Sequence, residues 1–233
     1  YPDGAFFVPL AAVDRVENIP TAIADALNFA LRDNTKSPQQ QLIRYLRSKN
    51  ILLIIDNLEH LMDGVELLLD MLSHCSGVML LVTSREQLNV QAEDLFGLRG
   101  LPVPDADQTT QADQFAAVRL FCDRAHRLLK TFKLMTSNSS DVMTICRLVE
   151  GLPLALELAA SWIRHYDVGQ LARSIAKNID LLQTTMRDLP PQHRSIRAVF
   201  DYSWRLLSPT EQAVLAKLSV FRGGFTDAEA ASV

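Results

Sequence analysis

The sequence predicts an α/β domain built on a parallel sheet, followed by an all-α region. Two apolar runs, in "ILLIID" (51–56) and "GVMLLVTSR" (77–85), are continuous rather than alternating. Such runs are typical of parallel strands whose two faces are both covered. Segments with helical spacing separate the runs, and only helical patterns follow from about residue 104 onward. This order favours a parallel sheet covered by helices on both faces, and then a helical region.

Each element of the first region is predicted from a local pattern. A Pro-Asp-Gly turn precedes the first apolar run, and Ser37 followed by Pro38 is the usual start of a helix. We expect strands over 4–10, 51–56 and 77–85, helices over 18–31, 38–48 and 64–75, and a short strand and turn within 94–103.

The second region is predicted to be helical throughout, after a polar linker at 103–114. We expect helices over 113–129, 139–149, 153–164, 168–176, 194–207 and 209–220, a break at 187–195, a turn at Gly223-Gly224 and a helix starting at Thr226. The predicted domains are therefore an α/β domain at 1–104, a helical domain at 105–187 and the start of a third domain at 188–233.

Composition excludes several classes of protein. The net charge of -4 gives no general basic field, so direct DNA binding by this chain is not expected. No apolar run approaches the roughly 18 residues of a membrane span, so we expect no membrane partner. The three cysteines are scattered, without the spacing of a metal site or a disulfide framework. A reducing, cytoplasmic location fits this number and spacing of cysteines best.

Two charged residues stand at predicted strand ends, where open parallel sheets bind their ligands. Asp56 ends one apolar run, and a carboxylate there can hold Mg²⁺ together with water. Arg85 follows the next run and can bind a phosphate through two hydrogen bonds. Taken alone, Asp56 could equally be a turn or capping residue, and Arg85 a member of a surface ion pair.

The order of three motifs favours the functional interpretation. "LLIIDNLEHL", "LLVTSREQL" and "GLPLALELAASWI" resemble the STAND class of P-loop NTPases, which includes the NB-ARC switches. The chain looks most like the ATPase module of bacterial multidomain regulators, and its last segment, from "RSIRAVFDYSW", resembles the start of their winged-helix domain. The resemblance implies a partial P-loop NTPase sheet at 1–104, an all-α helical lid at 105–187 and the start of a winged-helix domain at 188–233. It also implies a signal-transduction switch controlled by ATP, ADP and Mg²⁺, joined to an output domain such as a transcriptional regulator.

The resemblance also implies a role for each matching residue. Asp56 matches the Walker B aspartate that positions Mg²⁺. Asn57 holds the next position, which is often acidic in the class, and is counted with Arg85 and Pro153 among the implied nucleotide-binding residues. Glu59 is the nearest other carboxylate that could replace the usual catalytic group. Arg85 matches the sensor arginine that reads the γ-phosphate, and Pro153 matches the proline that packs on adenine. Glu59 could equally be a capping or solvated residue, and Pro153 also fits a helix start after Gly151.

The sequence departs from the class in one large respect, because it contains no G-x-x-x-x-G-K-[ST] loop. Since "YPDGAFFVPLA" resembles the second strand of the family, we expect the P-loop and the first strand to lie upstream in a longer protein. The chain alone would then bind no nucleotide tightly. The strand at 78–84 would keep an open edge, covered either by the 94–98 segment or by a second copy of the chain, which we favour.

Two functions are consistent with the sequence. The first is the ATP-dependent switch, in which the longer protein hydrolyses ATP and controls attached or partner signalling domains. The second is a non-catalytic interaction or regulatory module on an NTPase scaffold, which Asn57 and the missing loop favour.

Overall fold

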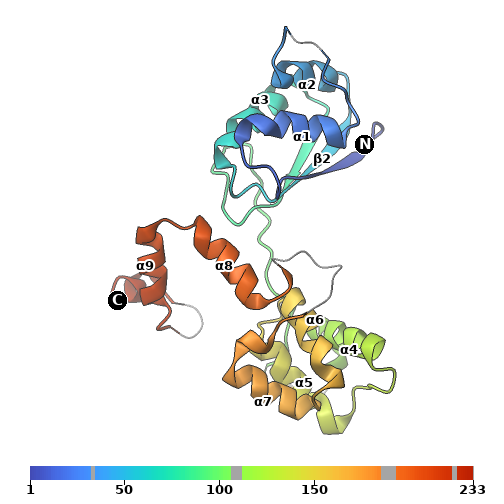
Figure 1. The fold of residues 1–233 in the computed structure, drawn as a ribbon, viewed down its shortest axis with the longest axis vertical. Coiled ribbons are helices and arrows are strands. Elements are labelled where there is room, and N and C mark those ends of the chain that lie inside the picture. Colours follow the sequence, from blue (N-terminus) through green and yellow to red (C-terminus); the bar gives the residue numbers. More distant parts are fainter. Residues whose placement is uncertain (33–34, 106–111, 185–192, 222–224, 233) are drawn as a thin grey trace. The chain divides into compact units, whose positions relative to one another are not determined.

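Figure 1 shows the computed structural model, which describes all residues except 33–34, 106–111, 185–192, 222–224 and 233. The described residues form two compact units, 1–96 and 97–233. Each unit has its own hydrophobic core. The expected turn at Gly223-Gly224 and part of the expected break at 187–195 lie outside the described residues.

The first unit contains a three-stranded parallel sheet in the order β1-β2-β3. Its strands are β1 (Ala5–Pro9), β2 (Ile51–Asp56) and β3 (Val78–Val82). In this register Val8 lies beside Ile55, and Ile55 lies beside Val82. The α/β class and the three predicted strands are therefore confirmed, with β3 shorter at both ends than the predicted 77–85.

The helices of this unit are α1 (Ile19–Ala26), α2 (Pro38–Leu46) and α3 (Val65–His74), with short 3-10 turns η1 (Val16–Asn18) and η2 (Met62–Gly64). Ser37 caps α2 as predicted, since its hydroxyl accepts a hydrogen bond from the Gln40 amide. Helix α1 ends well before the predicted residue 31. Asn28 has a φ of 51°, and a left-handed residue ends a helix.

The sheet packs its helices on one face. The side chains of Val8, Leu53 and Ile55 are fully buried in the same core as the helices. On the other face Phe7, Met79 and Leu81 remain 54–55% exposed. Within the described part of this unit, our expectation of a sheet covered on both faces is therefore wrong. Both crossovers step in the same direction across the sheet, and right-handed crossovers then place their helices on one side.

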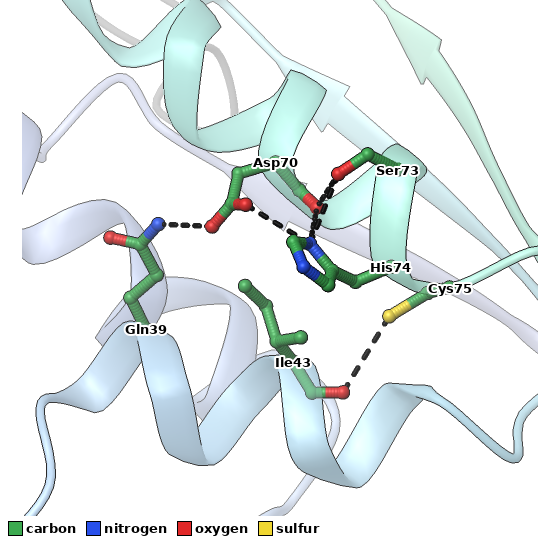
Figure 2. A network of polar contacts seen from close by, with 6 residues as sticks. All are labelled: Gln39, Ile43, Asp70, Ser73, His74 and Cys75. Atoms are coloured by element: carbon green, nitrogen blue, oxygen red, sulfur yellow. Dashed lines mark hydrogen bonds and ion pairs between the residues drawn. The ribbon is translucent and has the colours of Figure 1, made fainter.

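A polar network joins α2 to α3 (Figure 2). The Gln39 side-chain amide donates to the Asp70 carboxylate over 2.7 Å, and His74 Nδ1 lies 3.0 Å from the other oxygen of that carboxylate. The Cys75 thiol donates to the Ile43 carbonyl over 3.5 Å. Burial raises the pKa of this thiol. These contacts fix the helical layer that supports β2 and β3.

The second unit is helical. Its elements are η3 (Ala112–Gln114), α4 (Ala116–Leu128), α5 (Thr136–Leu148), α6 (Pro153–Ser161), η4 (Trp162–Arg164), α7 (Val168–Lys177), η5 (Ile179–Leu181), α8 (Ile196–Leu206), α9 (Pro209–Leu218) and α10 (Asp227–Ala230). The core of the unit comes from α4 to α7 and the turns beside them, with Phe121 as its largest fully buried side chain. Thr226 caps α10, which confirms the predicted helix start.

The predicted strand within 94–103 is wrong. Residues 94–103 have no regular structure, and Leu95, Phe96 and Leu98 are 60–87% exposed. The outer edge of β3 is open, but this run does not pair with it. Here Leu101 instead donates its amide to the Gly151 carbonyl over 2.9 Å. Leu101 and Val103, which we expected at the end of the first domain, pack against the core of the second unit.

In the described part of the chain, each helix is too short or too polar to cross a bilayer. The three predicted domain ranges and the winged-helix assignment of 188–233 stay predictions.

Candidate functional site at the carboxyl ends of β2 and β3

Asp56 and Thr83 lie side by side where β2 and β3 end. The Thr83 hydroxyl donates to Asp56 Oδ1 over 2.8 Å and accepts a hydrogen bond from the Asn57 amide over 2.9 Å. The Leu58 amide donates to the Thr83 carbonyl over 3.1 Å. The loops that leave the two strands are therefore fixed to each other. This fixed junction positions the side chains that follow.

Asn57 and His60 form a second link within the site. Asn57 has a φ of 69°, a left-handed conformation that asparagine tolerates better than most residues. Its side-chain amide lies 3.3 Å from His60 Nδ1, and His60 Nε2 lies 2.9 Å from the Val13 carbonyl. Because a carbonyl only accepts, the network assigns the hydrogen to Nε2 and makes Nδ1 the acceptor. His60 is thus a structural link between the β2 and β1 loops.

Glu59 and Arg85 form an ion pair across the same junction. The Glu59 side chain is 3% exposed and the Arg85 side chain 39% exposed, and 3.2 Å separate Glu59 Oε1 from Arg85 Nε. Among the described residues, Glu59 is the charged residue that the fold buries. Since a general base must reach a water molecule beside the substrate, this burial favours a structural role for Glu59 over a catalytic one.

Pro153 belongs to the second unit. It is the first residue of α6, it is exposed, and it follows Gly151, whose φ is +66°. A Cβ atom at Gly151 would overlap the Leu101 carbonyl, so a glycine is needed there. The predicted helix start at Pro153 is confirmed, whereas its contact with adenine stays a prediction.

Sequence reasoning brought together Asp56, Asn57, Glu59 and Arg85 but missed Thr83. The signal was present in the sequence. If the strands 51–56 and 78–82 pair without a shift, the residue after the second strand lies beside the last residue of the first. A hydroxyl at that position is able to orient a neighbouring carboxylate.

The side chains at this junction fit a magnesium ion better than a transition metal. The described residues contain no group of three or more His, Cys, Asp or Glu side chains placed to hold a metal. Mg²⁺ does not need such a cluster, because it keeps several waters and takes one or two carboxylates plus phosphate oxygens. Asp56, a half-exposed carboxylate beside the Thr83 hydroxyl, supplies oxygen ligands of that kind.

Comparison with known proteins gives relatives among mycobacterial proteins, while no protein-family model matches the chain. The chain is 30% identical over 224 residues to proteins of Mycobacterium tuberculosis and Mycobacterium bovis that are provisionally named HTH-type transcriptional regulators. The match covers 96% of this chain and 24% of those proteins. An uncharacterized protein of Mycobacterium tuberculosis is 27% identical over 223 residues, which are 95% of this chain and 54% of that protein. The chain therefore spans about a quarter of the length of the first relatives and about half of the other.

Proposed function

We propose that this chain is part of an ATP- or ADP-dependent switch in a longer regulatory protein. The observation that carries the proposal is the position of Asp56 and Arg85 at the carboxyl ends of two adjacent parallel strands. The Thr83 contacts lock these ends together. A carboxylate for Mg²⁺ and an arginine for a terminal phosphate are the charges that a nucleoside triphosphate requires.

The sheet order supports the same proposal. In the family that the motifs resemble, the first strand carries the P-loop and lies beside the strand at 78–84. In the present structure β3 is at the edge of the sheet, so its outer side can accept that strand. The uncovered apolar face with Phe7, Met79 and Leu81 would then receive the helix that follows the P-loop.

The relatives give the proposal its biological setting. Those that share 30% identity with the chain are named as transcriptional regulators, and they are about four times its length. We infer that the switch acts on an attached output domain, as in a regulator of transcription. The chain itself would supply the metal-binding and sensor residues, and the rest of the protein would supply the phosphate-binding loop.

A non-catalytic regulatory module is the second candidate. It is favoured by Asn57, which stands where a catalytic carboxylate is often found and whose amide contacts His60. It is also favoured by the burial of Glu59, the nearest possible substitute. In such a module the NTPase scaffold would be kept for binding a protein or DNA, without turnover of nucleotide.

Substitution of Asp56 separates the two candidates. Asp56→Asn keeps an oxygen that can accept from Thr83, so the fold is preserved, but it weakens the hold on Mg²⁺. In the full-length protein we expect ATP turnover to be lost, while the Kd for ATP changes by less than about tenfold. Asp63→Asn, an exposed carboxylate nearby, is the matched control. If Asp56→Asn hydrolysed ATP at the wild-type rate, the catalytic role of Asp56 would be contradicted. If the wild-type protein bound nucleotide without hydrolysing it, the second candidate would be favoured.

A further inference from the structure

We propose that Glu59 is a positioning residue, which holds the guanidinium of Arg85 in the orientation that recognises a terminal phosphate. This inference rests on the proposed function and assigns Glu59 a task different from that of a water-activating base. It follows from the way in which the fold places this carboxylate and this guanidinium.

The loops that carry Glu59 and Arg85 are held rigidly together. Leu58, which precedes Glu59, donates its amide to the Thr83 carbonyl, and Asn57 donates its amide to the Thr83 hydroxyl. The Thr83 amide in turn donates to the Ile55 carbonyl over 2.9 Å. Glu59 and Arg85 therefore extend from two loops that are joined by backbone hydrogen bonds, and their separation is set by the sheet.

The two side chains of the pair differ strongly in burial. The Glu59 side chain is 3% exposed, so the surrounding protein fixes it, whereas the Arg85 side chain is 39% exposed and reaches solvent. A buried anion beside a half-exposed cation acts as an anchor for the cation. A free arginine side chain loses rotamer entropy on binding, and an anchor removes part of that cost beforehand.

Arg85 contacts Glu59 through its Nε atom. Glu59 Oε1 lies 3.2 Å from Arg85 Nε, on the side edge of the planar guanidinium. An arginine held by this edge keeps a defined plane for its terminal nitrogens, and these are the atoms that bind a phosphate through two parallel hydrogen bonds. The pair is therefore compatible with phosphate binding, rather than a competitor of it.

The opposite hypothesis is that Glu59 is a latch, which occupies Arg85 until a phosphate displaces it. The two hypotheses predict effects of opposite sign. If Glu59 positions Arg85, removal of its charge weakens the preference for ATP over ADP. If Glu59 is a latch, the same change strengthens that preference, because the phosphate no longer has to compete.

The test measures the Kd values for ATP and ADP by calorimetry, with Mg²⁺, on the full-length protein. For Glu59→Gln, which keeps the shape of the side chain and removes its charge, we expect the ATP preference to fall about tenfold, with the ADP affinity unchanged. Arg85→Lys keeps the charge but cannot hold Glu59 and a phosphate through one planar group, so its preference should fall as well. Glu86→Gln removes an exposed charge next to Arg85 and should have no effect.

A nuclear magnetic resonance measurement on the 233-residue chain tests the contact without nucleotide. The Arg85 Nε–H hydrogen should exchange slowly with water in the wild type and in Glu86→Gln, and faster in Glu59→Gln. Three results would overturn the positioning role alone. They are an unchanged or stronger ATP preference in Glu59→Gln, a full ATP preference in Arg85→Lys, and Nε–H exchange in Glu59→Gln that equals that of the wild type. A wild-type protein that binds neither ATP nor ADP would overturn the proposed function, and the role of Glu59 in phosphate recognition with it.

Discussion

Thr83 donates its hydroxyl hydrogen to Asp56 across two neighbouring strand ends, with 2.8 Å between Thr83 Oγ1 and Asp56 Oδ1. The same hydroxyl accepts the Asn57 amide hydrogen. One threonine thus orients the proposed metal ligand and closes the loop after β2. This double role gives the site a property that can be measured before any ligand is known.

Thr83→Val should loosen the loop without disturbing the sheet. The valine keeps the size of the side chain but leaves the Asn57 amide without its acceptor. If that hydrogen bond stabilises the loop by about 1 kcal/mol, the Asn57 amide should exchange about fivefold faster with water. Amide hydrogen exchange followed by nuclear magnetic resonance measures this, with Thr83→Ser as the variant that keeps the bond. Equal protection of Asn57 in all three proteins would contradict the assignment.

Cys146, which is buried, and Cys122, which is partly buried, should make the second unit less stable at alkaline pH. Burial raises the pKa of Cys146 from 9.0 to about 12 and that of Cys122 to about 11. Above pH 9 the unfolded thiols lose protons that the folded ones keep, so stability is fully present below pH 9 and falls as pH rises towards the folded values. One such thiol lowers the free energy of unfolding by about 1.4 kcal/mol per pH unit in that window.

Denaturation at pH 8.5 and pH 10 tests this expectation. Trp162 and Trp204 both lie in the second unit, so their fluorescence reports its unfolding. The loss of stability between the two pH values should be smaller in Cys146→Ala than in the wild type. Cys75→Ala, in the other unit, should leave the loss unchanged. A wild-type loss that Cys146→Ala does not reduce would contradict the assigned cause.

The exposed sheet should make the isolated chain self-associate. The edge strand β3 has an open outer side, and the face with Met79 and Leu81 is apolar and more than half exposed. Light scattering at increasing concentration should show species larger than a monomer. Met79→Lys with Leu81→Lys should restore the monomer, whereas Leu98→Lys, in a segment outside the sheet, should not. A wild-type chain that stays monomeric at high concentration would contradict this expectation.

Local sequence signals predicted the elements that have local causes. The apolar run at 51–56 became β2 with the predicted bounds, and Ser37 with Pro38 started α2 where the capping pattern placed it. The 94–98 segment also carries large apolar residues, but no neighbouring strand pairs with it, and it forms no strand. Whether an apolar run becomes a strand thus depends on a partner that the run itself does not reveal.

The site was predictable as a set of residues but not as a geometry. Asp56 and Arg85 could be placed at strand ends from the order of apolar runs. The ion pair between Glu59 and Arg85 could not, because it depends on how two loops of unlike sequence meet. Local sequence patterns also could not predict the uncovered face of the sheet, since that face follows from the strand order.

The preference of the full-length protein for ATP over ADP, measured by calorimetry in the presence of Mg²⁺, tests the central claim most directly. If Arg85 reads the terminal phosphate, the wild type should discriminate between the two nucleotides, and Arg85→Ala should bind both with nearly equal affinity. The ADP affinity should change little, because ADP lacks the phosphate that Arg85 would contact. The same ratio of ATP to ADP affinity in the wild type and in Arg85→Ala would contradict the account.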